Sequence, residues 1–492
     1  MRRGFRAIIT QVNNFLSRNI FLQVILVGLL STLLLSAPIP QPATRALYQA
    51  RLASQSDAPK LASEQLAKAA SYLPWRSDLL CLAGRWSLQA GDPQASIDYI
   101  NQISTGEELP PDCLLSLGEA YQAAGYPQKA VEAWQMIPES AGYSDTILTM
   151  LLGIYQAEAD YLHEIEVLKS IYNMHPNESR YSYRLGLLLA VYDPEASQAY
   201  LSQAGESDPA LLDHASDLIR QINTARLYDQ PAYTSLSVGR WMASQEEWRL
   251  AELAFRRAIE LRPDFAEAWA YLGESLQHIE TTSTQSTPDK GYLELQTALQ
   301  ISPDSVPSNV LMSFYWQRQS EDEKALEYLE RALKAEPDNP ILLAEYGRLK
   351  AILGDLITAQ EYYEQAAEKA PNNPTFWRLV AEFSLDHQVQ VRQIALPAAG
   401  NVIRLAPDAP QSLDLMGKTL IALGELEKAE EILLKAIELD DSYASAHLHL
   451  GLVYLNQGNV LQAQREFDIA ERLAPDSAIS DQITRLYNYY FP

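Results

Sequence analysis

The residue types that most often perform catalysis are sparse in this chain, and their spacing matches no catalytic motif. The 492 residues include 7 histidines and 2 cysteines, and there is no GxSxG, GxxxxGK[ST], HExxH or CxxC sequence. His447 and His449 would lie about 200° apart around a helix axis, so we expect one to face the core and the other solvent. They cannot easily share a metal ion. The sequence therefore predicts no catalytic residue, no metal site and no cofactor.

The two cysteines are compatible with two different states. Cys81 and Cys113 fall near the beginnings of two successive predicted first helices, where a disulfide is geometrically feasible in an oxidising compartment. We prefer the interpretation that both are unpaired, buried thiols. Two cysteines are too few for a disulfide framework or a cysteine-rich metal site.

The charge balance argues against a nucleic-acid partner. The chain has 63 Asp and Glu against 38 Lys and Arg, which gives a formal net charge of −25. A surface that follows a phosphate backbone needs an excess of Lys and Arg instead. We therefore expect no nucleic acid among the partners.

The first 37 residues differ in charge from the remainder. Residues 1–19 carry four arginines and no acid, and residues 20–37 are uncharged and rich in Leu, Ile and Val. An eighteen-residue helix is about 27 Å long, close to the hydrocarbon thickness of a bilayer. We expect a basic cytoplasmic stub and a single-pass transmembrane or signal-anchor helix at 20–37, which contacts the lipid bilayer and leaves the later residues outside the cytoplasm. The alternative is a cleaved signal peptide and a secreted chain.

Beyond this segment the sequence repeats with a period of 34 residues. The clearest unit begins at Ala444 and has characteristic residues at positions 7, 8, 11, 20, 24, 27 and 32, namely Leu450, Gly451, Tyr454, Ala463, Phe467, Ala470 and Pro475. This pattern resembles the tetratricopeptide repeat (TPR) family, and the resemblance extends over about residues 43–477. It implies an all-α, right-handed α-solenoid of about twelve helix-turn-helix repeats. No long period-2 pattern competes with the helices.

Position 8 is small in every proposed unit. It is Gly in nine units and Ala50, Ser313 or Ala381 in the other three. We expect a packing reason: position 8 of the first helix meets position 20 of the second, and a bulky side chain there would push the two helices apart.

Departures from the period divide the chain. The predicted parts are an array of five degenerate repeats (43–208), an extra helix and seam (209–231), an array of seven repeats (232–477) and a capping helix (478–492). Residues 280–290 replace an inter-helix turn with Thr, Ser, Gln and Pro, and we expect an exposed loop there.

In TPR proteins the first helices line a concave face, and position 9 is one of the exposed positions on it. The resemblance thus predicts a partner-binding groove at Arg240, Glu274, Phe314, Arg348, Glu382 and Lys418. The alternating charges and the phenylalanine suggest a partner with both charge signs and some apolar contact. The paired Lys and Asn residues with which some TPR proteins grip a peptide carboxylate are missing.

The sequence accordingly predicts a non-enzymatic, membrane-anchored scaffold whose groove binds a protein or peptide partner. The layout of one amino-terminal span followed by repeats suggests envelope or membrane-complex assembly. The alternative is a glycan-binding TPR component of polysaccharide assembly or export, which would need aromatic side chains exposed on the groove. The oligomeric state stays open.

Overall fold

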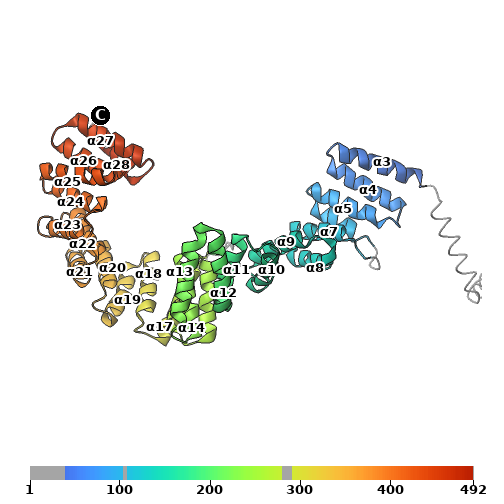
Figure 1. Cartoon of the computed structure of the whole chain (residues 1–492), viewed down its shortest axis with the longest axis horizontal. Helices are drawn as coiled ribbons and strands as arrows, with labels where there is room; N and C mark the ends of the chain where they lie inside the picture. The colour runs from blue at the N-terminus through green and yellow to red at the C-terminus, as the bar shows by residue number, and fades with distance from the viewer. Residues whose placement is uncertain (1–38, 104–107, 280–290, 491–492) are drawn as a thin grey trace, which may run out of the picture. The chain divides into compact units, whose positions relative to one another are not determined.

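A computed structural model describes residues 39–103, 108–279 and 291–490. These ranges contain 26 α-helices, α3–α28, and one short 3-10 turn at Glu139–Ala141, with no β-strand (Figure 1). The fold of the described residues is therefore an all-α, TPR-like solenoid, as the repeats predict. The predicted stub (1–19), anchor helix (20–37) and loop (280–290) lie outside the described residues. Within those ranges, no helix is long and apolar enough to cross a membrane.

The chain divides into two compact units between Leu185 and Gly186, inside helix α11. Within the described residues, the first unit contains eight whole helices and the beginning of α11. They are α3 (Gln41–Gln55), α4 (Pro59–Tyr72), α5 (Ser77–Gln89), α6 (Pro93–Ile100), α7 (Pro111–Ala123), α8 (Pro127–Gln135), α9 (Ser144–Glu158), α10 (Tyr161–Met174) and α11 (Ser179–Tyr192).

The second unit holds the more regular repeats. Its helices after α11 are α12 (Pro194–Ser207), α13 (Pro209–Arg226), α14 (Pro231–Ser244), α15 (Trp248–Leu261), α16 (Ala266–His278), α17 (Tyr292–Ile301), α18 (Val306–Arg318), α19 (Asp322–Ala335), α20 (Pro340–Ile352), α21 (Leu356–Lys369), α22 (Pro374–Asp386), α23 (Ala395–Leu405), α24 (Pro410–Ala422), α25 (Leu426–Leu439), α26 (Ala444–Asn456), α27 (Val460–Leu473) and α28 (Ala478–Tyr490).

Twelve helix pairs account for all of these helices except α13 and α28. Helix α13 occupies the residues of the predicted extra helix and packs against α12 and α14, so this seam lies within the second unit. Helix α28 occupies the predicted cap and packs on α26 and α27, with Ile483 fully buried.

Local sequence signals explain where the helices begin and turn. Helices α20 and α22 each begin at a proline, whose missing N–H would have had no partner in the first turn. The preceding Asn339 and Asn373 accept backbone N–H bonds with their side chains. Between first and second helices, Gly354 and Gly458 take positive φ angles of 82° and 83°, which side chains with a Cβ rarely adopt.

In three helix pairs of the second unit, position 8 of the first helix lies directly against position 24 of the second helix. A Cβ added to Gly239, Gly417 or Gly451 would come within 2.5 Å of the position-24 side chain, and all three nearest atoms belong to that side chain. These position-24 residues are Phe255, Leu433 and Phe467, each fully buried. The prediction that position 20 is the nearest neighbour is therefore wrong for these units. It holds for Gly347, where the backbone oxygen of Ala359 at position 20 is nearest, at 3.1 Å.

Alanine at position 8 should have opposite effects in two units. Gly239→Ala forces its Cβ against Phe255, and we expect a loss of about 1–3 kcal/mol in stability. Gly153→Ala meets no atom within 4 Å, and we expect a gain of about 0.5–1 kcal/mol from lower backbone entropy of the unfolded chain. Chemical denaturation followed by circular dichroism, with hydrogen exchange in α9 and α15, measures both. Equal effects of the two substitutions would contradict the packing account.

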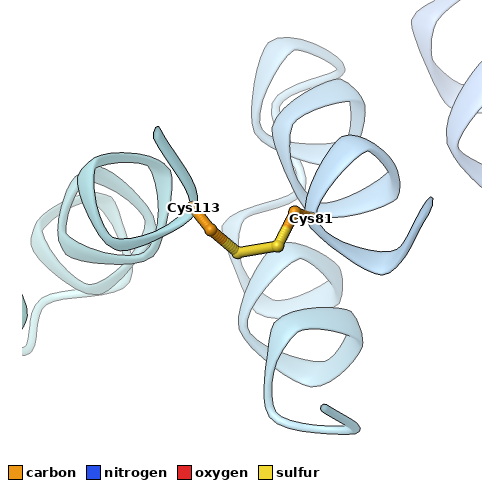
Figure 2. Close-up of a disulfide and its surroundings, with 2 residues drawn as sticks. All are labelled: Cys81 and Cys113. Atoms are coloured by element: carbon orange, nitrogen blue, oxygen red, sulfur yellow. A yellow bond between two sulfur atoms is a disulfide. The ribbon is translucent and has the colours of Figure 1, made fainter. Parts of the chain in front are cut away.

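Cys81 and Cys113 form a disulfide that joins the first helices of successive pairs, α5 and α7 (Figure 2). Their Cα atoms are 5.2 Å apart, within the range that a disulfide requires. The preferred expectation of two free thiols is therefore wrong. Side chains on neighbouring first helices come into direct contact here, which the repeat positions of the two cysteines allow but do not by themselves establish.

Reducing this disulfide should destabilise the first unit. The two cysteines are 32 residues apart in the sequence. For a loop of that length, the lower chain entropy of the cross-linked unfolded state stabilises the fold by roughly 3–4 kcal/mol. We expect the oxidised chain to take up no iodoacetamide until it is unfolded and reduced, and the reduced chain to unfold at lower denaturant concentration. The double substitution Cys81→Ala with Cys113→Ala serves as the control, because reductant should leave its unfolding midpoint unchanged.

Candidate functional site

The predicted groove residues lie on successive first helices of the second unit. We call the exposed side of α14, α16, α18, α20, α22, α24 and α26 the first-helix face. Neighbouring first helices are in contact at α14–α16, α16–α18, α22–α24 and α24–α26. Side chains from adjacent repeats can therefore interact across this face.

One cross-helix cluster surrounds Glu274 of α16. Arg318, from α18, donates two guanidinium N–H groups to the Glu274 carboxylate and its Nε to the amide oxygen of Gln277, at 3.0 Å. His278 lies 3.1 Å from the same carboxylate and stacks on the ring of Trp248, with ring centroids 3.9 Å apart. Glu274 is thus already neutralised by a neighbouring helix.

Arg348 and Lys418 are also paired. The Arg348 guanidinium donates to Glu345 one turn earlier in α20, with Nε at 2.9 Å, and to the amide oxygen of Gln317 in α18. Gln317 in turn donates to Glu345 at 3.1 Å. Lys418 of α24 donates to Asp386 of α22 at 2.9 Å. The side chain of Arg348 is 43% exposed and that of Lys418 is 39% exposed, so a partner can still reach both cations.

Phe314 of α18 is not a freely exposed aromatic. It is half-buried and packs on the apolar cluster that contains Leu311, Met312 and Leu295. The glycan-binding alternative needs aromatic side chains exposed on the groove, and Phe314 does not provide one.

Arg240 of α14 differs from the other predicted cations. It is exposed and forms no ion pair with any residue that the structure describes. Its guanidinium lies 5.3 Å from the ring centroid of Tyr271, in α16. Beside it is a pocket of about 300 Å³ lined by α13 and α14 residues, Asp217 and Trp241 among them.

Glu382 is the groove carboxylate whose charge is least well compensated. Burial raises the pKa of the Glu382 carboxyl, while Arg378, 4.0 Å away, and Lys418 act in the opposite direction. The charged form is therefore disfavoured in the folded state. Such a group favours folding when protonated and loses that contribution as the pH rises through its folded-state pKa.

Glu382→Gln should slightly raise the urea midpoint at pH 7. We expect a gain below about 0.5 kcal/mol, because the side chain is 44% exposed, and no gain at pH 3, where the carboxyl is protonated in both states. Glu431→Gln is the matched control: a hydrogen bond from Lys435 lowers the pKa of Glu431, so its loss should lower the midpoint at pH 7. Shifts of the same sign in both variants would contradict this account.

The sequence-based search missed the partners that pair the groove charges. Arg318 and Asp386 stand at position 13 of their units, one turn beyond position 9, and Gln317 at position 12. A joint inspection of positions 9, 12 and 13 in neighbouring units would have shown complementary charges. The sequence-based prediction compared position 9 only with position 5, where these partners do not lie.

The two histidines of α26 are both largely buried, so the expectation that one faces solvent is wrong. His447 lies 2.7 Å from the Glu466 carboxylate and 3.2 Å from the backbone oxygen of Asp441. His449 lies 2.6 Å from Asp414 of α24 and is only 13% exposed. A neighbouring first helix buries His449, and helix periodicity within one repeat does not show this. No group of three potential metal ligands occurs in the described ranges.

Comparison with known proteins supports the repeats. Residues 319–383 match the tetratricopeptide repeat family, and residues 417–458 match a TPR repeat family. The chain contains tetratricopeptide repeats. These matches cover α19–α22 and much of α24–α26, the helices that carry Arg348, Glu382 and Lys418.

Curated relatives share part of the chain. The CTR9 homolog of Arabidopsis thaliana is 27% identical over 290 residues, which are 55% of this chain and 26% of the relative. The protein O-mannosyl-transferase TMTC3 of Mus musculus is 23% identical over 213 residues, or 42% of this chain and 20% of the relative. The chain thus spans about a quarter or less of the length of these relatives.

Solved structures with TPR-like folds also match. YrrB, described as a TPR protein with an unusual peptide-binding site, is 18% identical, with 39% of this chain and 97% of YrrB covered and a TM-score of 0.31. MamA from Desulfovibrio magneticus RS-1 is 26% identical, with 35% and 97% covered and a TM-score of 0.31. The Cut9–Hcn1 structure is 12% identical, with 90% and 96% covered and a TM-score of 0.37.

Proposed function

We propose that this chain is a non-enzymatic scaffold that binds a partner protein along the first-helix face of its second unit. The observation that carries the proposal is a stripe on α20. Ile341, Glu345, Arg348 and Ile352 are spaced i, i+4, i+7 and i+11, which places them on one side of a helix. The two isoleucines are 68% and 53% exposed and flank the Glu345–Arg348 ion pair.

This stripe has the composition of a contact surface. Large aliphatic side chains that stay exposed gain free energy when a partner covers them, by about 25 cal/mol per Å² of buried apolar surface. The ion pair between them supplies both charge signs and can exchange hydrogen bonds with a partner's polar groups. An extended peptide or a partner helix with alternating apolar and charged groups fits this arrangement.

We further propose that residues 20–37 hold the chain in a membrane as a single span, with the amino terminus in the cytoplasm and the repeats on the opposite side. The basic residues of 1–19 favour this orientation. The Cys81–Cys113 disulfide supports an extracytoplasmic array, because disulfides persist in oxidising compartments. Amino-terminal sequencing of the mature protein separates a retained anchor from a cleaved signal peptide, whose removal would give a start near Pro38.

Envelope or membrane-complex assembly is the context that we propose for this scaffold. It accords with a membrane-attached array that presents a binding surface and has no convergent set of catalytic residues in the described ranges. The scaffold requires no cofactor.

Site-specific photo-crosslinking in cells tests the binding surface. A photoreactive amino acid in place of Ile341 or Ile352 should crosslink the same partner protein. The matched control is Ile357 of α21, a second-helix residue that is 76% exposed. Crosslinking of that partner from Ile357 as efficiently as from Ile341 would place the binding surface elsewhere.

Charge reversal gives a second test with the same partner. Arg348→Glu combined with Lys418→Glu should weaken capture about tenfold or more, because it removes both cations and leaves Glu345 and Asp386 facing like charges. Arg256→Glu combined with Lys435→Glu makes the same charge change at ion pairs of the second helices α15 and α25. Similar loss of capture in both double variants would indicate a general effect of net charge.

A further inference from the structure

The pocket beside Arg240 is built by a helix that the repeats do not include. Helix α13 stands outside the helix pairs and contributes Asp217 and Gln221, while α14 contributes Arg240, Trp241 and small polar residues. The pocket has a volume of about 300 Å³, at the small end of the range for ligand sites. It is therefore suited to a single side chain or chain end and not to a large cofactor.

Arg240 brings an unused set of donors to this pocket. The Tyr271 ring lies beside the guanidinium, whose N–H groups have no carboxylate partner among the described residues. Each of the other first-helix cations considered above, Arg318, Arg348 and Lys418, has a carboxylate on its own or a neighbouring helix. A planar guanidinium that is held by a ring and free of an ion pair is preorganised for a carboxylate.

The Asp217 carboxylate, which also lines the pocket, would repel a bound carboxylate only weakly. Both oxygens of the Asp217 carboxylate have partners: Arg220 binds one, and the indole Nε1 of Trp241 donates to the other at 2.9 Å. The Arg220 charge offsets that of Asp217. Ser237, one turn before Arg240 in α14, adds a hydroxyl donor to the pocket lining.

We propose that the α13–α14 pocket binds a carboxylate of the partner polypeptide through the Arg240 guanidinium. This proposal rests on the proposed peptide-binding function and adds the chemistry of one subsite to it. The carboxylate belongs to an Asp or Glu side chain or to the chain terminus, since both present the same two oxygens to the guanidinium. Bound there, it would fix the register of the partner at the end of the first-helix face where α13 adjoins the repeats.

The first experiment selects peptides from a library of random dodecapeptides with the purified full chain. We expect enrichment of Asp and Glu at one position in the selected peptides. Arg240→Gln should weaken the best such peptide at least tenfold, which is the size expected for a charge-assisted bidentate contact. Arg256→Gln is the matched control: it removes the same charge from a paired arginine of the second helix α15, outside the first-helix face, and we expect less than a threefold change. Circular dichroism checks that both variants remain folded.

A double-mutant cycle identifies the carboxylate. Replacing the enriched acid of the peptide by its amide should weaken binding to the wild-type chain and leave binding to the Arg240→Gln variant almost unchanged. If amidation of the peptide terminus has that effect instead, the bound carboxylate is the chain end. Equal loss from the peptide amide in both proteins, or unchanged binding to Arg240→Gln, overturns the carboxylate subsite while the peptide-binding function stands. If no peptide binds the wild-type chain, the proposed function itself fails.

Discussion

The contact between position 8 of a first helix and position 24 of its second helix is the constraint on which the fold depends. In the α14–α15, α24–α25 and α26–α27 pairs, a fully buried Phe or Leu lies directly against a glycine, so closely that one added methyl group would overlap it. A large side chain thereby fills the space that the missing Cβ leaves. Such close contacts within a pair contribute to the stability that small helical units need in order to stack.

Close packing within the pairs lets the first helix of one pair contact the first helix of the next, as at α16–α18 and α24–α26. That repetition generates the first-helix face and the cross-helix contacts on it, including Arg318 with Glu274 and Lys418 with Asp386. In the first unit, the Cys81–Cys113 disulfide likewise joins two successive first helices. The two ion pairs connect neighbouring repeats on their exposed side, whereas the disulfide connects them beside the apolar core, where Cys113 is buried. Helix α13 interrupts the repetition, and the pocket beside Arg240 lies at this interruption.

The 34-residue period predicts the helix pairs, because small and large residues at fixed positions reflect contacts within one pair, and the departures from the period predict the extra helix and the cap. It does not predict which side chains meet between pairs, since those contacts depend on the rotation from one repeat to the next. For this reason the expectations of two free thiols at Cys81 and Cys113 and of one solvent-facing histidine in α26 were wrong. The position-9 residues do lie on successive first helices, but their pairing with positions 12 and 13 could not be derived from position 9 alone.

This pairing changes what a binding surface on these repeats requires. A partner that approaches Arg348 or Lys418 competes with a carboxylate already bound there, so these residues favour a partner that supplies both charge signs and exchanges one ion pair for another. Arg240 imposes no such exchange, because its guanidinium lies beside the Tyr271 ring and forms no ion pair with any described residue. A carboxylate that binds Arg240 would therefore not have to replace a carboxylate of the described residues. The binding free energy of such a contact would accordingly be less offset by a lost ion pair than that of a contact at Arg348 or Lys418.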